Sequence, residues 1–279
     1  MKSMMKRNTF REIKKSFGRY FAILAIVALG VAFFSGLKIT QSVMVHSADV
    51  YLKDLQFYDY RLVSTLGFTE ENVEALAEKE DVRAAEGAIS AEILYKDAGE
   101  NERVIKMHSI TEKVNKLKLV AGEMPQSADE CVVDSALFSE DAIGSKLVLS
   151  ENNTADDLDK FAYKEYTITG LVQSPCYIQF ERGNTSIGNG RISGFAYILK
   201  DGFAVDYDTE IYIKFDEDYD IYSDEYDSYM DAKEADWEAY TKEQADIRYE
   251  KIVKDAQDEL DEKKEELEEK RAEAEVELE

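Results

Sequence analysis

Residues 20–37 read YFAILAIVALGVAFFSGL and contain no charged side chain. A helix rises about 1.5 Å per residue, so this stretch would span about 27 Å, close to the roughly 30 Å hydrocarbon core of a bilayer. Tyr20 and Lys38 can lie at the two interfaces. A cleaved signal peptide is the alternative, but the apolar stretch is longer than the usual signal core and no clear cleavage site follows it. We therefore expect residues 20–38 to form an uncleaved transmembrane helix.

Charge is divided unevenly around this stretch. Residues 1–19 hold seven lysines and arginines and a single acidic residue, Glu12, whereas the whole chain of 279 residues has a formal net charge of −25. Basic residues stay on the cytoplasmic side of a membrane helix, so we expect a cytoplasmic N-terminus and an acidic remainder outside the cell membrane. Because a body this acidic repels phosphate backbones, nucleic acid is excluded as a partner.

Residues 1–19 have the pattern of a basic amphipathic segment. Thr9 and Glu12 have the spacing of a capping box, which predicts a helix that begins at Thr9. Apolar residues follow at intervals of three and four, with basic residues between them: Phe10, Ile13 and Phe17. We expect this helix to lie on the lipids of the inner leaflet. A disordered basic tail that only sets the topology of the anchor is the alternative.

Residues 39–56 keep a helical period after the anchor. Ile39, Val43, Tyr51 and Leu55 recur at helical spacing, and the segment contains no Asn, Gly or Pro. Since nothing in it breaks a helix, we expect the membrane helix to continue as a stalk to about residue 56.

Residues 57–215 change to the patterns of a mixed domain. Alternating strands, turns and one capped helix predict a small α+β extracytoplasmic domain with a helix on one face of a sheet. The expected strands cover residues 58–62, 82–86, 89–95, 103–110, 131–133, 146–149, 163–172, 192–198 and 210–215. We expect a turn at Gly67, a helix after the N-cap Thr69 with Val73, Leu76 and Ala77 on its core face, a short helix over 135–142 ended by Gly144, and a surface loop over 150–159.

Residues 216–279 predict a long acidic coiled-coil helix. Seven of the twelve residues 216–227 are acidic, and apolar residues then recur every seven positions, namely Val253, Leu260, Leu267 and Ala274. The companion series begins with Tyr249 and Ala256 but turns to Lys263 and Lys270, so the seam needs a partner helix. We expect the sequence to be truncated before a returning helix; a natural C-terminus in a frayed charged helix is the alternative.

No residue set in the chain predicts a catalytic, cofactor-binding or metal site. Residues 183–189 have the glycine spacing of a phosphate loop, but Asn189 stands where the lysine should be, so we expect a turn. His46 and His108 have no nucleophile motif nearby. Cys131 and Cys176 could form a disulfide or stay as buried free thiols. The acidic run 216–227 lacks the glycine and ligand spacing of a calcium loop. We therefore do not expect an enzyme.

Three stretches together resemble a known family. They are residues 57–76 (FYDYRLVSTLGFTEENVEAL), the order LVAGEMP, DECVVD and AIGSKLVL within 119–149, and residues 170–212 from GLVQSPCYIQF to DYDTEIY. They resemble the N-terminal part of FtsX-like (MacB-type) ABC transporter permeases, above all the large members with a coiled-coil insertion. The order of anchor, stalk, α+β domain and coiled coil is the more specific part of the resemblance.

The resemblance implies a multi-spanning membrane permease, assembled as a dimer, that works with a separate cytoplasmic ABC ATPase. Motion driven by nucleotide would pass through the stalk to the outside domain, either to export a peptide, lipoprotein or lipid-like substrate or to control a cell-envelope protein. The later core helices of such a permease are absent from this sequence. A complete single-pass anchored binding or scaffold protein with a projecting coiled coil is the alternative, and a sensor ectodomain is disfavoured by the short cytoplasmic segment.

Overall fold

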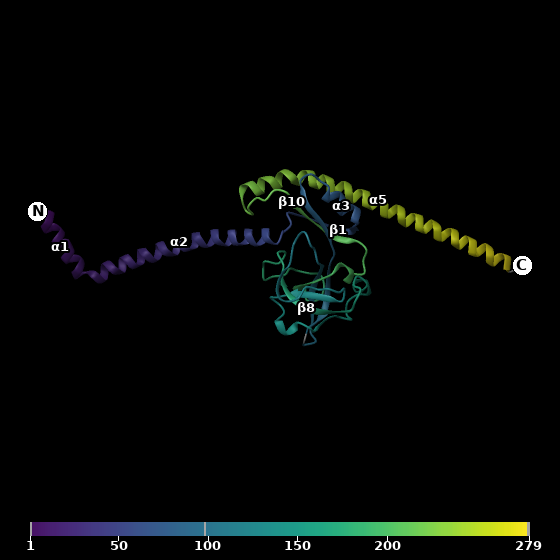
Figure 1. Ribbon diagram of the computed structural model, residues 1–279, viewed down its shortest axis with the longest axis horizontal. Coiled ribbons are helices and arrows are strands. Elements are labelled where there is room, and N and C mark those ends of the chain that lie inside the picture. Colours follow the sequence, from purple (N-terminus) through teal and green to yellow (C-terminus); the bar gives the residue numbers. More distant parts are fainter. Residues whose placement is uncertain (1, 98, 278–279) are drawn as a thin grey trace. The chain divides into compact units, whose positions relative to one another are not determined.

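The computed structural model describes residues 2–97 and 99–277 (Figure 1), without the side chains of residues 2, 3, 6, 268, 269 and 271–277. Its residues group into two compact units, Met1–Tyr51 and Leu52–Glu279. The architecture is α+β, with an N-terminal apolar helix, two mixed or antiparallel sheets and a long C-terminal helix. The fold class expected from the sequence is confirmed.

The first unit is helical. Helix α1 covers Lys2–Lys15, and helix α2 covers Phe17–Asp54 as 38 continuous residues that extend into the second unit. Among the described residues, α2 is the one helix long and apolar enough to cross a membrane, and the protein buries none of its most apolar window. The sequence predicts one continuous helix from residue 20 to about residue 56. The structure confirms the continuous helix, which ends at Asp54.

The capping box expected at Thr9 is wrong. Helix α1 begins at Lys2, so Thr9 lies inside it, and the Thr9 hydroxyl donates to the Met5 carbonyl one turn back at 2.9 Å. The break between α1 and α2 falls at Ser16 instead. The capping box does not form because the residues before Thr9 are already helical. No free helix terminus is therefore present at Thr9 for its side chain to cap.

A three-stranded antiparallel sheet forms the first layer of the second unit. Its order is β1 (Tyr60–Phe68), β10 (Asp208–Phe215) and β2 (Val82–Ala88), so β10 is central although it comes last in the chain. Helix α3 (Glu70–Ala77) follows β1, and the Asn72 side chain accepts a hydrogen bond from the Thr69 N–H at 3.0 Å, as an N-terminal cap should. The expected helix start at Thr69 is confirmed.

Helix α5 (Asp224–Glu277) shares the same face of this sheet with α3 (Figure 1). The indole of Trp237 is 4% exposed, with ring centroids 5.5 Å from Phe215 and 5.7 Å from Tyr60. Leu76 of α3 and Ile213 of β10 belong to the same buried cluster. The first turns of the long helix are therefore part of a hydrophobic core, while Val253, Leu260 and Leu267 further along it are exposed.

A seven-stranded mixed sheet forms the second layer. Its order is β5 (Lys118–Gly122), β8 (Glu165–Gln173), β6 (Glu130–Asp134), β9 (Ile192–Ile198), β4 (Glu102–Ser109), β3 (Ser90–Lys96) and β7 (Lys146–Leu149). A further pairing of β7 with β8 closes the sheet on itself. The main core lies inside this closed sheet and includes Ile93, Ile105, Val133, Tyr166 and Ile198, each fully buried.

Some expected elements differ from the structure. Residues 135–142 form turns and a single 3-10 turn, η1 (Glu140–Ala142), rather than a helix. Gly67 was expected in a turn but lies within β1, which is longer than the expected strand. Ala77 was expected on the core face of α3 but is exposed. The polar loop expected over 150–159 contains one helical turn, α4 (Ala155–Leu158), and strand β5 was not expected. Each error concerns a short segment whose state depends on its neighbours rather than on its own period.

We predict that Trp237→Ala detaches the first turns of α5 from the small sheet. Loss of a buried aromatic side chain should lower the free energy of unfolding by about 3–5 kcal/mol. The measurement is urea unfolding of the full chain in detergent, followed by circular dichroism. Tyr249→Ala is the matched control, because Tyr249 lies on the same helix and is exposed; an equal loss in both variants would contradict the predicted role of Trp237.

Candidate functional site

The residues weighed for chemistry in the sequence do not come together in one place. Residues 183–189 form a turn in which the Thr185 N–H donates to the Gly190 carbonyl at 3.2 Å, and strand β9 follows directly. Cys131 and Cys176 are both free thiols, which overturns the disulfide alternative. Burial raises the pKa of the Cys176 thiol to about 11, so it is protonated at neutral pH.

The acidic run 216–227 meets basic side chains of the same unit. The Arg83 guanidinium lies 2.9 Å from a carboxylate oxygen of Asp218 and donates to the carbonyl of Asp216, and Lys53 Nζ lies 2.6 Å from Asp220. No group of three His, Cys, Asp or Glu in the described part of the chain is arranged to hold a metal ion. These contacts connect the segment that precedes α5 to β2 and to the last turn of α2.

A buried ion pair lies just beyond the end of α2, and we call its surroundings the Asp59 junction (Asp59, Asn115, Lys214 and Tyr226). Lys214 Nζ lies 3.0 Å from Asp59, and both side chains are less than 10% exposed. The other Asp59 oxygen accepts the Phe215 N–H at 2.9 Å, and the Tyr226 hydroxyl of α5 donates to Asp59 at 3.4 Å. One carboxylate therefore holds the chain after α2, the end of β10 and the start of α5 together.

Backbone hydrogen bonds join the residues between α2 and Asp59 to the loop that contains Asn115. The Asn115 N–H donates to the Gln56 carbonyl at 2.9 Å, and the Lys116 N–H donates to Leu55 at 2.8 Å. Asn115 in turn accepts the Tyr58 N–H through its side chain at 3.1 Å. Gln56 and Asn115 both have positive φ, a conformation that Asn tolerates better than most residues. The segment leaving α2 is thus fastened to the loop that precedes β5.

The carboxylate of Glu86 fixes that same loop to the small sheet. It accepts three backbone N–H groups, from Glu112 at 2.7 Å, Lys113 at 2.9 Å and Val114 at 3.1 Å. Since Glu86 lies on β2, the loop over 112–116 joins the end of α2 to both layers of the second unit.

A second buried carboxylate lies between the two layers. Glu210 of β10 forms a two-pronged ion pair with Arg61 of β1, at 2.7 and 2.9 Å, and accepts hydrogen bonds from Ser90 and Tyr212. Lys106 of the larger sheet lies 4.0 Å away. Burial alone would raise the pKa of Glu210, but the hydrogen bonds from Arg61, Ser90 and Tyr212 outweigh it and hold the pKa at about 2. Glu210 therefore stays charged and links the small sheet to β3 and β4 of the larger one.

His108 lies beside this pair within the larger sheet. Its Nε2 is 2.6 Å from the Tyr177 hydroxyl, and its ring stacks on Tyr197 at 5.0 Å. Burial, together with the nearby positive charge of Lys106, lowers the pKa of His108 to about 3, against a smaller opposite effect of Glu210. The imidazole is therefore neutral, and with no nucleophile bonded to it we assign it to packing rather than to acid–base chemistry.

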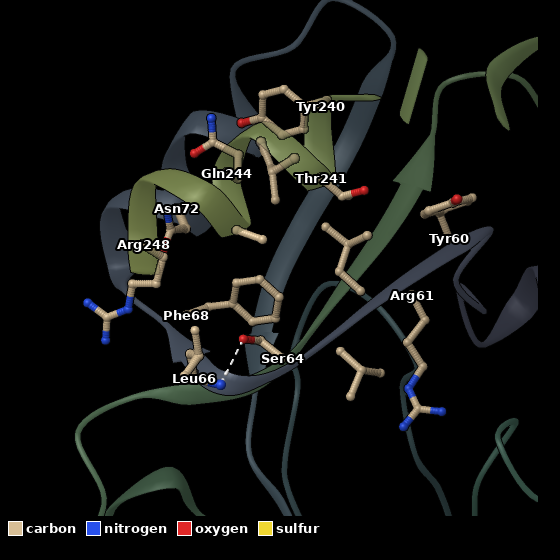
Figure 2. A pocket seen from close by; sticks show the side chains of 15 residues that line it. Tyr60, Arg61, Ser64, Leu66, Phe68, Asn72, Tyr240, Thr241, Gln244 and Arg248 are labelled. Atoms are coloured by element: carbon tan, nitrogen blue, oxygen red, sulfur yellow. Dashed lines mark hydrogen bonds between the residues drawn. The ribbon is translucent and has the colours of Figure 1, made fainter. Parts of the chain in front are cut away.

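A pocket of about 290 Å³ opens between β1, α3 and α5 (Figure 2). Figure 2 shows Tyr240, Thr241 and Gln244 of α5 on one side and Ser64 and Phe68 of β1 on the other. The register of β1 on β10 shifts between Val63 and Phe68, so the strand bulges there. Gly67 has a φ of +72°, and a Cβ at this position would lie 2.5 Å from the Tyr207 ring, so only glycine fits.

No family model matches the chain, and no curated protein matches it. Among solved structures it is similar to the extracellular domain of the ABC-type transporter YknZ from Gram-positive bacteria, with 12% identity, 55% of this chain and 76% of that chain covered, and a TM-score of 0.36. It is also similar to the periplasmic region of MacB from Actinobacillus actinomycetemcomitans, with 14% identity, coverage of 57% and 69%, and a TM-score of 0.36.

Sequence reasoning did not find the two buried carboxylates. Asp59 and Lys214 appear in the sequence only as polar positions of alternating strands, 155 residues apart. Glu210 and Arg61 have the same appearance at a separation of 149 residues. The available signal is that the expected strands near residues 58–62 and 210–215 each carry charged residues. This signal identifies the ion pairs only when the pairing of β1 with β10 is known.

We predict that Asp59→Ala lowers the free energy of unfolding by about 3–5 kcal/mol, because it leaves the buried Lys214 ammonium without its partner. Urea unfolding of the full chain measures the loss. Asp54→Ala is the control, since Asp54 is exposed at the end of α2. The double variant Asp59→Leu, Lys214→Met should recover part of the loss; no recovery would contradict the assignment of the loss to an unpaired charge.

We predict that His108 makes the fold less stable in acid. Its folded-state pKa of about 3 lies below the ordinary 6.5, so the unfolded chain binds the extra proton and stability falls as the pH drops from about 6.5 toward 3. Between pH 6.5 and 5 this contribution should approach about 2 kcal/mol.

The measurement is the change in unfolding free energy between pH 7 and pH 5 for wild type and for His108→Phe. His108→Phe should show the smaller pH dependence by that amount, whatever its absolute stability. His46→Phe is the control, because His46 is exposed on α2. An identical pH dependence in wild type and His108→Phe would rule this contribution out.

Proposed function

We propose that this chain is the N-terminal part of a permease subunit of an ABC transporter. In this proposal α2 anchors the chain in the cell membrane with its N-terminus in the cytoplasm, and the unit Leu52–Glu279 lies outside. A separate cytoplasmic ATPase drives motion of the membrane helices, and the chain passes that motion to the extracytoplasmic unit. The chain itself carries out no catalysis.

The observation that carries the proposal is the unbroken connection through α2 to the Asp59 junction. Helix α2 has no interruption between Phe17 and Asp54, so a displacement at one end reaches the other without a hinge. The next five residues are fastened to the loop over 112–116, to β10 and to α5 by the contacts described above. These contacts support the proposal that a movement of the end of α2 also moves both sheets and α5.

The resemblance of the sequence supports the finer parts of the proposal. It favours a dimeric, multi-spanning assembly that exports a peptide, lipoprotein or lipid-like substrate or controls a cell-envelope protein. Helix α5 would reach a partner away from the membrane, and its exposed residues Val253, Leu260 and Leu267 would form the seam of a coiled coil.

The first test is the native state of the protein in isolated membranes. An antibody against residues 57–215 should detect a polypeptide several times larger than the 31.8 kDa of this sequence. Purification under mild detergent should bring down an ABC ATPase in equal amount, identified by mass spectrometry. A membrane-bound band of the calculated mass without an ATPase would reject the permease proposal.

We predict that Ser47→Pro uncouples the extracytoplasmic unit from the ATPase. A proline in the middle of a helix removes a hydrogen bond and kinks it, at a cost of about 3 kcal/mol, whereas membrane insertion depends on the segment before it. The measurement is the ATP-dependent change in hydrogen exchange of residues 112–116 in the purified complex.

The wild type and the control Ser47→Ala should show this change, and Ser47→Pro should not. Ser47 is exposed on α2, so neither substitution disturbs a core. A change of equal size in Ser47→Pro would show that a rigid α2 is not needed for transmission.

A second candidate is a single-pass anchored binding or scaffold protein. It is favoured by helix α5, whose residues Val253, Leu260 and Leu267 are exposed and could pack against a binding partner. The membrane experiment above distinguishes the two, because only the permease requires an ATPase and a larger polypeptide.

A further inference from the structure

Strand β1 is an edge strand whose protection is limited to a bulge and to Arg61. Within the described residues it pairs on one side only, with β10, so its other edge has no partner strand. Natural proteins cover such edges or place lysine or proline on them. β1 instead exposes two apolar side chains, Val63 at 63% and Leu66 at 41%. A nine-residue edge of this kind is a template for another strand.

The pocket of Figure 2 adjoins this edge and provides apolar surface beside it. Its walls include Phe68, Leu76 and Ala245, and its volume of about 290 Å³ is enough for one or two side chains. Ser64 and Leu66 line the pocket in the stretch of β1 where the pairing with β10 is irregular, and there the Ser64 hydroxyl accepts the Leu66 N–H at 3.1 Å.

The charge of the pocket is opposite to that of the chain. The chain has 59 acidic and 34 basic residues, yet the described residues that line this pocket include two arginines and no acid. Arg61 is already paired with Glu210. Arg248 of α5, at the other end of the pocket in Figure 2, has its Nε buried and without a hydrogen-bond partner. An occupant should therefore carry an acidic group at the Arg248 end.

We propose that β1 and this pocket bind an extended peptide segment of a partner protein, with alternating apolar side chains and one acidic residue. The peptide adds as a strand to the free edge of β1, an apolar side chain enters the pocket, and the acidic residue pairs with Arg248. This site goes beyond the proposed coupling function and does not depend on an ATPase.

The test uses the full chain in detergent and a fluorescein-labelled heptapeptide with capped ends, Thr-Val-Thr-Val-Glu-Val-Thr, together with a version in which Lys replaces Glu. Fluorescence anisotropy should show saturable binding of the Glu peptide, several-fold tighter than the Lys peptide, and hydrogen exchange should show protection of the β1 amides over residues 63–67. Val63→Lys should weaken binding at least about tenfold, because a charge on an edge strand blocks strand addition.

Two variants separate binding from folding. Val120→Lys is the matched control, since Val120 is exposed on β5, the edge strand of the other sheet, and it should bind the peptide like wild type. Arg248→Glu should reverse the preference and bind the Lys peptide more tightly, a result that loss of structure cannot produce. Both variants should retain the circular dichroism of the wild type.

Five outcomes would overturn the proposal, and the first four concern binding. These are no saturable binding up to about 1 mM peptide, equal weakening in Val63→Lys and Val120→Lys, no reversal in Arg248→Glu, and binding of decanoate at the pocket in place of either peptide. Concentration-dependent dimerisation that Val63→Lys abolishes, without peptide binding, would assign the edge to a second copy of the chain and overturn it too. Any of these results leaves the proposed coupling function standing.

Discussion

The buried carboxylate of Asp59 is the constraint on which the rest of the second unit depends. An aspartate removed from water is tolerated only when its charge is balanced and its oxygens accept hydrogen bonds. Lys214, the Phe215 N–H and Tyr226 meet that requirement, and they come from β10 and α5. The chain that leaves α2 therefore cannot be placed without also placing the central strand of the small sheet and the start of the long helix.

The same strand, β10, carries the second buried charge pair. Side chains alternate across a strand, so Ile211, Ile213 and Phe215 enter the core under α3 and α5, whereas Glu210, Tyr212 and Lys214 face the opposite way. Glu210 and Lys214 each find their partners on that polar face. A single strand thus joins a hydrophobic core on one face to two ion pairs on the other.

The two ends of α5 have different physical roles. Near Trp237 the helix is stabilised by burial against the sheet, and it contributes to a core as any short helix would. Beyond the pocket, Tyr249, Val253, Leu260 and Leu267 are exposed among charged residues, so this part needs another helix for its stability. Between the two parts lies the pocket beside β1, where the helix leaves the sheet and apolar surface is left uncovered.

The sequence by itself determined the features that rest on local period and composition. The uncharged stretch 20–37 predicted the apolar helix, the heptads predicted the long terminal helix, and alternation over 210–215 predicted both faces of β10, because each signal is carried by neighbouring residues. Only the tertiary structure decided which strands pair, that β10 lies between β1 and β2, and that the larger sheet closes through β7 and β8. The Asp59 and Glu210 pairs belong to this second group, since they join residues about 150 positions apart that only strand pairing brings together.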